Sequence, residues 1–432
     1  MQVADSVDAA RVIKKQAQPA AFMTRPAHWL IALGTVALLM LVPAGAAAAK
    51  DRAVVTVATV NVGAEGNPSV AIVPFTDAIY QSCADAPQTD RGCQTVGEVD
   101  YRYGIGRLEI TVRQWVAFLN TVDPTGRDRH NLYSSSESST EWPRFGQINM
   151  RPKARPGHHY RVAFPAWANK PYGFANFLRA ARFANSLGNG RTVAKRAVNV
   201  GGHRVVKRKI MLSRQTERGM YNMRRPNTTR TKKTGFVVPS QDEWIKAAYY
   251  DPSGGGTFSY WKYPTNAGVF GDGDATAPTQ TTLNAANGNV TNASTQPLAT
   301  FHASGQDAPA WCPAGVRPAS DCSTVNPFGF DSDNYAKAYQ GSLGTVGQAK
   351  TTSPWGTLDQ GGNAVEWTDT ITLPPLGKTK GRVWRRMHGG VPNAPSYQLW
   401  LSAIGLQPQD NVGFTASYPW LGIRIGMINR GK

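Results

Sequence analysis

The stretch "LDQGGNAVEW", Leu358 to Trp367, holds the residues of this 432-residue chain whose types and spacing most readily suggest chemistry. Asp359 and Glu366 stand seven residues apart in it, around a glycine pair that lets the backbone turn freely. Two such carboxylates serve as acid and base, as metal ligands, or as the polar ends of a tight turn. An acid–base pair is the weakest interpretation, because nothing nucleophilic accompanies these carboxylates.

The four cysteines fall into two close pairs. Cys83 and Cys93 bound "CADAPQTDRGC", and Cys312 and Cys322 bound "CPAGVRPASDC". Four cysteines allow three pairings, and two local loops are the least demanding choice. Zinc is the competing interpretation, but neither pair has CxxC spacing or a histidine cluster beside it. We therefore expect two disulfides, each closing a surface loop in an oxidising compartment.

The N-terminal segment 1–49 has the three parts of an export signal. Basic residues lead an apolar run, "WLIALGTVALLMLVPAGAAAA", which ends in small residues. We expect a signal peptide cleaved near Ala48 or Ala49, with the mature chain extracytoplasmic, either secreted or periplasmic. A retained N-terminal anchor stays open as the alternative, since the run is nearly long enough to span a bilayer.

A basic segment at about 191–233 carries most of the positive charge. The formal net charge is +19, and this segment holds 14 Lys and Arg against one acid, Glu217. Such a density attracts polyanions at low ionic strength. Because export argues against intracellular nucleic acid, we expect no specific nucleic-acid partner, and an acidic polysaccharide, lipid headgroup or acidic protein remains. The alternative is a solvated loop that keeps the chain soluble.

Three segments that would position these residues have the pattern of amphipathic helices. The first begins after a candidate N-cap at Thr111, the second ends at Gly188, and the third opens with a capping box of Ser240 and Glu243. Strand-like alternation precedes the first helix and returns in short pieces after residue 355. With 43 Gly and 29 Pro, this pattern predicts one compact, loop-rich α+β domain.

Several stretches, in order, resemble the formylglycine-generating-enzyme family, also called sulfatase-modifying-factor domains. They are "YGIGRLEITVRQWVAFLN", "NKPYGFANFLRAARFANSLGNG", "FVVPSQDEWIKAAYYDP", "YWKYPTN", "WGTLDQGGNAVEWTD", "RMHGG" and "LGIRIG". The resemblance implies a variant of the C-type lectin fold, loop-rich, with a small twisted antiparallel sheet and two or three helices. On this basis, residues 50–432 form a single domain with a basic insertion at about 191–233 and a loop insertion at about 300–330.

The resemblance also implies a use for the opening stretch, because the family's loop before its Trp-Glu-Trp motif holds a structural calcium ion. Carried onto this chain, Glu366 offers side-chain oxygens, while Gly361, Gly362 and Ala364 offer backbone carbonyls. Asp359 is a further candidate by proximity. Calcium prefers six to eight oxygen ligands, so this loop is a reasonable host. The alternative is a glycine-rich turn in which Glu366 forms a salt bridge with a neighbouring arginine.

The family's oxidases bind copper through two cysteines that follow a double glycine near the C-terminus. In this chain the corresponding positions fall near Ala394 and Leu399, and Val391 replaces the family's serine. Cu(I) needs soft thiolate ligands, so we expect no copper and nominate no catalytic residue. The seven histidines show no HxxxH spacing for the iron sites of other branches. Copper-dependent formylglycine generation is therefore not expected.

The function that remains is a non-catalytic binding scaffold stabilised by calcium. In the region that resembles the family's ligand-facing end, the chain places Tyr397, Trp400, Tyr418 and Trp420. Aromatic side chains suit stacking on sugars or peptide side chains, although filling the core is their alternative role. The ligand, protein or carbohydrate, is not specified. An oxidoreductase or protein-modifying enzyme with a changed active site is the alternative function.

Overall fold

In the computed structural model, the described residues are 52–72, 94–138, 146–225, 227–254, 259–265, 278–284, 289–292, 297–301, 343–372, 382–390, 399, 401, 403, 405–410 and 420–430. They lie within one compact unit, Ala49–Lys432. The expected signal peptide, residues 1–49, falls outside the described residues, and its cleavage stays a prediction. Among the residues that are described, no helix is long and apolar enough to cross a membrane.

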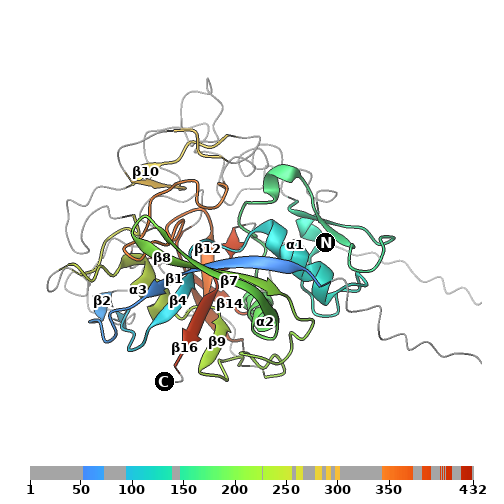
Figure 1. The fold of residues 1–432 in the computed structure, drawn as a ribbon, viewed down its shortest axis with the longest axis horizontal. Helices are drawn as coiled ribbons and strands as arrows, with labels where there is room; N and C mark the ends of the chain where they lie inside the picture. Colours follow the sequence, from blue (N-terminus) through green and yellow to red (C-terminus); the bar gives the residue numbers. More distant parts are fainter. Residues whose placement is uncertain are drawn as a thin grey trace, which may run out of the picture. The chain divides into compact units, whose positions relative to one another are not determined.

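The largest sheet has six antiparallel strands in the order β7-β8-β1-β4-β16-β9 (Figure 1). In β1, Val55 and Val57 are buried while Val54 and Thr56 are exposed, which confirms the alternation predicted for this segment. The bounds of the six strands are β1 Val54–Val62, β4 Tyr103–Gly106, β7 Arg191–Val200, β8 His203–Met211, β9 Thr234–Val237 and β16 Gly426–Asn429.

The three predicted helices are present, as α1 Val112–Val122, α2 Phe177–Gly188 and α3 Gln241–Tyr249. Thr111 and Ser240 each complete a capping box, which satisfies backbone N–H groups that the first turn leaves unpaired. Helix α1 packs on β1, α2 on β9, and α3 on the second sheet. In the core, Trp115 of α1 stacks on Tyr172 with ring centroids 4.3 Å apart.

The second sheet has four strands in the order β14-β13-β12-β15. Strand β12 pairs antiparallel with β13 and parallel with β15, so the stretch that holds Glu366 lies inside this sheet. The bounds are β12 Val365–Thr372, β13 Trp384–His388, β14 Gly405–Pro408 and β15 Leu421–Gly422. Three helices with largely antiparallel sheets give the α+β class that the sequence predicts.

Short two-stranded pairs and two 3₁₀ helices complete the described elements. The pairs β2–β3 and β5–β6 are antiparallel, and β10–β11 is parallel. Their bounds are β2 Val70–Ile72, β3 Gln94–Val96, β5 Ile148–Met150, β6 Tyr160–Val162, β10 Thr279–Gln280 and β11 Leu298–Ala299. The 3₁₀ helices are Ser135–Glu137 and Pro165–Trp167.

The first half of the basic segment, residues 191–211, forms a β-hairpin and not a loop, although most of β7 is exposed to solvent. Strands β7 and β8 are joined by Gly201 and Gly202, both at positive φ, as a tight two-residue hairpin turn requires. Strand β8 pairs with β1 from Val54↔Met211 to Val60↔Val205. The hairpin is therefore part of the largest sheet, with β7 at its edge.

Candidate functional site

Glu366 lies at the start of β12 and is fully buried. The Arg424 side chain donates two hydrogen bonds to the Glu366 carboxylate, from Nε to Oε2 at 2.8 Å and from Nη2 to Oε1 at 2.7 Å. Trp244 of α3 donates its indole N–H to Oε2 at 2.6 Å. Both carboxylate oxygens of Glu366 are thus occupied. The salt bridge to an arginine, which the sequence left open as the alternative for this residue, is the arrangement present.

Arg424 connects several backbone segments besides Glu366. Its Nη1 donates to the carbonyl oxygen of Gly106 at 2.8 Å, and its Nη2 donates to that of Leu358 at 2.9 Å. The guanidinium is fully buried, just before β16. Because a guanidinium presents five N–H donors in a rigid fork, one side chain can hold the end of β4, the glycine-rich loop and β12 together.

Two further buried carboxyls lie in the electrostatic range of Arg424. Glu109 Oε2 is 4.0 Å from Arg424 Nη2, and Glu109 Oε1 accepts a hydrogen bond from Asn363 at 3.0 Å. Asp359 accepts from the backbone N–H of Gly347. Burial raises the pKa of Asp359 to about 6, and burial together with Asp359 raises the pKa of Glu109 well above its ordinary value. Both acids therefore keep their protons to a higher pH than an exposed carboxyl would.

The glycine pair of this loop has a packing reason. Gly362 has φ of +85°, and a Cβ there would collide with the carbonyl oxygen of Thr300. The backbone segments around Thr300 and Gly362 cross at this point, where the Asn363 N–H donates to Thr300 O at 2.8 Å. The carbonyl of Gly362 accepts from the Ala364 N–H at 2.8 Å. The glycine thus admits a neighbouring backbone.

The loop as arranged does not fit a calcium ion held through Glu366. A dication at about 2.3–2.6 Å from those oxygens would meet the positive guanidinium of Arg424 already bonded to them. Among the described residues, no group of three or more His, Cys, Asp or Glu is placed to hold a metal ion. Calcium binding by Asp359, Gly361, Gly362, Ala364 and Glu366 remains an untested prediction.

The family's copper positions carry no thiol in this chain, and one of them is described. Leu399 is fully buried, and its side chain belongs to a small apolar cluster with Tyr263, Ala299 and Phe301. Its carbonyl oxygen accepts a hydrogen bond from the Tyr249 hydroxyl at 2.8 Å. The position therefore has a packing role. Its counterpart near residue 394 lies outside the described residues.

The double glycine of the same region follows a histidine that the sequence did not nominate. His388, at the end of β13, is buried and stacks on Trp244 with ring centroids 5.1 Å apart. Burial, with Arg386 nearby, lowers the pKa of His388 to about 3, so the imidazole is neutral at physiological pH. It is an aromatic packing element in this position.

Most of the predicted contact residues lie outside the described part of the chain. Of the aromatic set, only Trp420 is described; it is half-buried against the main core, while Tyr397, Trp400 and Tyr418 are not described. The cysteines at 83, 93, 312 and 322 also lie outside, so both disulfides stay predictions.

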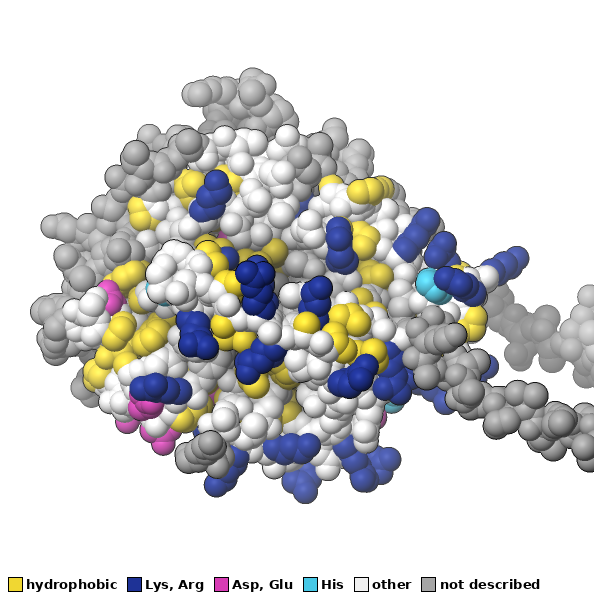
Figure 2. All heavy atoms as spheres, in the orientation of Figure 1, with side chains coloured by type: hydrophobic (Ala, Val, Ile, Leu, Met, Phe, Trp, Pro, Cys, Tyr) yellow, Lys and Arg dark blue, Asp and Glu magenta, His cyan; other side chains and the backbone are white. Residues whose placement is uncertain are grey.

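The basic hairpin brings like charges face to face. In the register of β7 and β8, Lys195 lies opposite Arg208, and Arg196 lies opposite Lys207. Lys195, Arg196 and Lys207 are exposed and form no salt bridge with any described carboxylate. Figure 2 shows the face over these strands scattered with Lys and Arg and with few Asp or Glu. Directly opposed like charges destabilise a strand pair.

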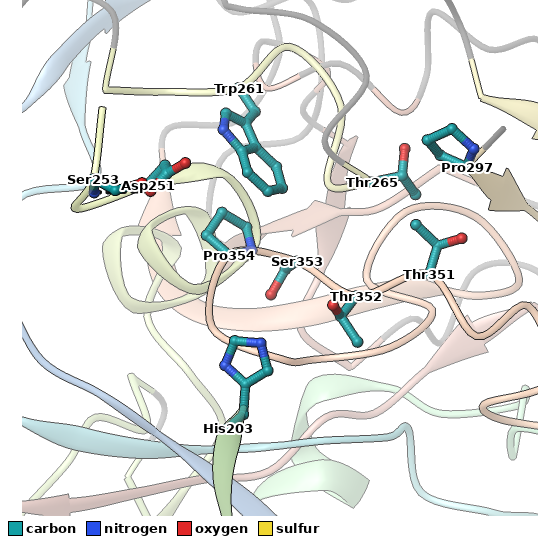
Figure 3. Close-up of a pocket in the computed structure, with 10 residues that line it drawn as sticks. All are labelled: His203, Asp251, Ser253, Trp261, Thr265, Pro297, Thr351, Thr352, Ser353 and Pro354. Carbon is teal, nitrogen blue, oxygen red and sulfur yellow. Dashed lines mark hydrogen bonds between the residues drawn. The ribbon is translucent and has the colours of Figure 1, made fainter. Parts of the chain in front are cut away.

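A pocket of about 470 Å³ opens beside the hairpin turn (Figure 3). Its lining comes from segments far apart in the sequence: His203 at the start of β8, Asp251 after α3, Trp261, and the stretch 351–354. No spacing rule joins these residues, so a pattern search along the sequence does not find the pocket. The single available signal was "VNVGGHRVV", in which a Gly-Gly pair between alternating runs predicts a hairpin ending at His203.

Comparisons with known proteins bear on this chain at the level of the family. Residues 78–391 match the family described as Sulfatase-modifying factor enzyme 1-like domain. No curated protein matches the chain.

Similar solved structures cover most of the chain at low identity. They include Treponema denticola variable protein 1, at 15% identity and TM-score 0.38, covering 86% of this chain and 95% of that chain. CarF has 15% identity and TM-score 0.39, covering 86% and 98%, respectively. PvdO from Pseudomonas aeruginosa has 12% identity and TM-score 0.36, covering 88% and 97%.

Proposed function

Because the chain belongs to the formylglycine-generating-enzyme, or sulfatase-modifying-factor, family, we propose that it is an exported, non-catalytic binding scaffold built on that family's fold. One observation carries the non-catalytic part. Leu399 stands where the resemblance puts a copper thiolate, and its side chain fills an apolar cluster. An alkyl side chain has no lone pair for Cu(I), and neither does the alanine expected at the other position.

Copper loading tests this proposal directly. We expect the purified protein, incubated with Cu(I) and passed through a desalting column, to retain well under one copper per chain. We also expect no oxygen-dependent conversion of a cysteine-containing peptide. The double variant Ala394→Cys/Leu399→Cys is the matched control, because gained copper there would show that the two positions face each other. Stoichiometric copper on the wild type, or peptide conversion, would overturn the proposal.

Export has its own test in the N-terminal segment. We expect protein recovered from the extracytoplasmic fraction to begin near residue 49 or 50, as mass spectrometry of the intact chain would show. Recovery of uncleaved chain in the membrane fraction would favour an anchored scaffold instead.

A second candidate function, polyanion binding by the hairpin β7–β8, has separate support. Lys195↔Arg208 and Arg196↔Lys207 are opposed like charges at an exposed sheet edge. A bound polyanion would remove that repulsion, and its affinity would fall as salt screens the charges. Dextran sulfate is a suitable probe, because it offers dense negative charge without a specific shape.

The charge-reversal triple Lys195→Glu, Arg196→Glu and Lys207→Glu is expected to elute from dextran sulfate at clearly lower salt than the wild type. The matched control reverses three exposed charges away from the hairpin, Arg129, Lys153 and Arg155. Both triples change the net charge equally. Equal elution of the two triples would mean that net charge alone governs retention, and would contradict a site on the hairpin.

A further inference from the structure

The pocket beside the hairpin turn combines an aromatic surface with polar groups that have no partner among the described residues. Figure 3 shows Trp261 and Pro354 next to each other, with His203, Thr352 and Asp251 arranged around the same space. Trp261 is half-buried, so part of its indole faces the pocket. The pocket's volume of about 470 Å³ lies within the range of small-molecule sites.

The polar atoms of this pocket are available to a ligand. No hydrogen bond from a described residue engages the Trp261 indole N–H, the His203 ring or the Thr352 hydroxyl. Asp251 accepts from the Ser253 N–H and hydroxyl through Oδ1, and no described residue bonds to Oδ2. The Thr265 hydroxyl is a stronger indication, because it is buried and has no hydrogen-bond partner among the described residues. An unpaired buried hydroxyl is costly unless a ligand or water satisfies it.

The charge of the lining defines what the pocket prefers. Asp251 is the one carboxylate among the lining residues, and no Lys or Arg is among them. Burial, with Arg107 nearby, lowers the pKa of His203, so its imidazole is neutral at physiological pH. A phosphate, sulfate or carboxylate would meet no cation among the lining residues, in contrast to the hairpin strands. A neutral molecule with several hydroxyls and one apolar face matches both the indole and the unpaired polar atoms.

We propose that this pocket binds one neutral pyranose ring of a glycan, with the C–H face of the sugar on Trp261 and its hydroxyls on Asp251, His203 and Thr352. The inference gives the proposed scaffold a ligand class and rests on that function only in requiring that the chain bind something. It is independent of the C-terminal aromatic set, which contains Trp420. His203 begins β8, the strand that also carries Lys207, so the pocket and the basic hairpin share this strand.

Saturation-transfer NMR with the methyl glycosides of glucose, galactose, mannose and N-acetylglucosamine tests the pocket, with glucuronate as the charged comparison. At least one neutral glycoside is expected to bind with a Kd on the order of 1 mM, as is usual for so small a ligand. Trp261→Ala is expected to weaken it at least tenfold, and Thr352→Val about threefold. Thr56→Val, at an exposed position of β1, is the matched control for the threonine change.

Each outcome decides for or against the pocket. Unchanged binding in Trp261→Ala, with an unchanged melting temperature, would overturn it, as would preference for glucuronate or no saturable binding of any neutral glycoside. Loss of binding in Trp420→Ala, with Trp261→Ala unaffected, would leave the scaffold function standing and move its ligand to the C-terminal aromatic residues. A Trp261→Phe variant that retains most of the affinity would support stacking.

Discussion

The buried cluster around Arg424 and the exposed hairpin β7–β8 use charge in opposite ways. In the cluster, the Glu366 carboxylate and the Arg424 guanidinium are both fully buried, and each is hydrogen-bonded on several sides. On the hairpin, Lys195 faces Arg208, and no described carboxylate pairs with Lys195. The same kind of side chain fixes the fold in one region and leaves charge unpaired in the other.

The two regions differ because the cluster is removed from water, whereas the hairpin stays in contact with it. An isolated charge removed from water costs several kcal/mol, so a buried charge persists only with matched partners. Water and salt screen the charges on an exposed strand, so mismatches there cost only about 0.2–1 kcal/mol. An unpaired charge therefore costs little free energy only at the surface, and an oppositely charged ligand can pair with it there.

The largest effect is expected when the buried pair is broken. Arg424→Met leaves Glu366 buried without its guanidinium and removes the donors to Gly106 and Leu358. Breaking a buried pair in this way costs about 3–5 kcal/mol of unfolding free energy. Urea denaturation followed by circular dichroism would measure the loss.

The control for this change is an exposed pair. Arg102→Met removes the partner of Glu65 at the surface and is expected to leave the urea midpoint unchanged. If both variants lose stability equally, burial is not what makes the Arg424 contact valuable, and the contrast between the two regions fails.

A smaller effect is expected at Asp359, which forms no salt bridge with a described cation, although the charges of Arg424 and Arg107 favour its ionised form. Burial raises the pKa of Asp359 to about 6 from an ordinary value of 3.8. Between about pH 4 and pH 6 the folded state binds this proton more tightly than the unfolded state, so stability falls as pH rises through that window. Asp359→Asn mimics the protonated form, and φ of +54° suits asparagine.

We therefore expect Asp359→Asn to be more stable than the wild type above pH 6, by about 1–3 kcal/mol, and similar to it near pH 4. Chemical denaturation at pH 4, 5, 6 and 7.5 gives the difference curve. A variant that loses stability at pH 7.5 would show that the ionised carboxylate has a stabilising partner, such as a cation, and would contradict a raised pKa for Asp359.

At the hairpin, charge reversal of Lys195 is expected to have a smaller effect. It should raise the stability of the strand pair and lower the affinity for a polyanion. Lys195→Glu places an acid opposite Arg208, which replaces repulsion with attraction and adds about 0.2–1 kcal/mol to the stability of the strand pair. The same change removes a charge from the polyanion surface, so elution from dextran sulfate moves to lower salt. Lys153→Glu, away from the hairpin, should change neither stability nor elution to the same degree. A joint loss of stability and binding would mean that the fold itself needs Lys195.

The contrast also explains which features the sequence could predict. The helix starts at Thr111 and Ser240 depend on residues three positions apart, and both capping boxes are confirmed. The partner of Glu366 is Arg424, 58 residues away, and only the tertiary fold brings them together. The sequence left open a salt bridge to an arginine without naming that arginine.

The sequence did not predict the packing role of Gly362 or the pocket at Trp261, and each failure has a physical reason. Gly362 suggested carbonyls curled around an ion, but its missing Cβ makes room for the Thr300 backbone. Close approach and ligand binding leave the same glycine signal in a sequence, so spacing cannot separate them. The pocket at Trp261 draws on five segments, and no single stretch carries its pattern.

The smallest effect is expected from removing divalent cations, and it tests whether the buried cluster is complete without an ion. Glu366 already receives hydrogen bonds from Arg424 and Trp244, so a chelator such as EGTA should leave the melting temperature of the wild type unchanged. If the chain had a calcium site, calcium at 100 times the Kd would add about 2.7 kcal/mol to the free energy of unfolding, and thermal melts detect such a change readily.

Arg424→Met makes the same test sharper, because it removes the cation that competes for Glu366. If calcium then stabilises the variant but not the wild type, the guanidinium and the ion are alternative partners for one carboxylate. If calcium stabilises the wild type and Asp359→Asn abolishes that effect, the predicted oxygen ligands hold an ion beside Arg424, and the cluster needs a second positive charge. Three buried carboxyls surround the fully buried guanidinium of Arg424, and Arg107 is a further, partly buried cation near Asp359. Protons on Asp359 and Glu109, or a bound cation, are competing ways to neutralise the remaining negative charge, so this measurement separates them.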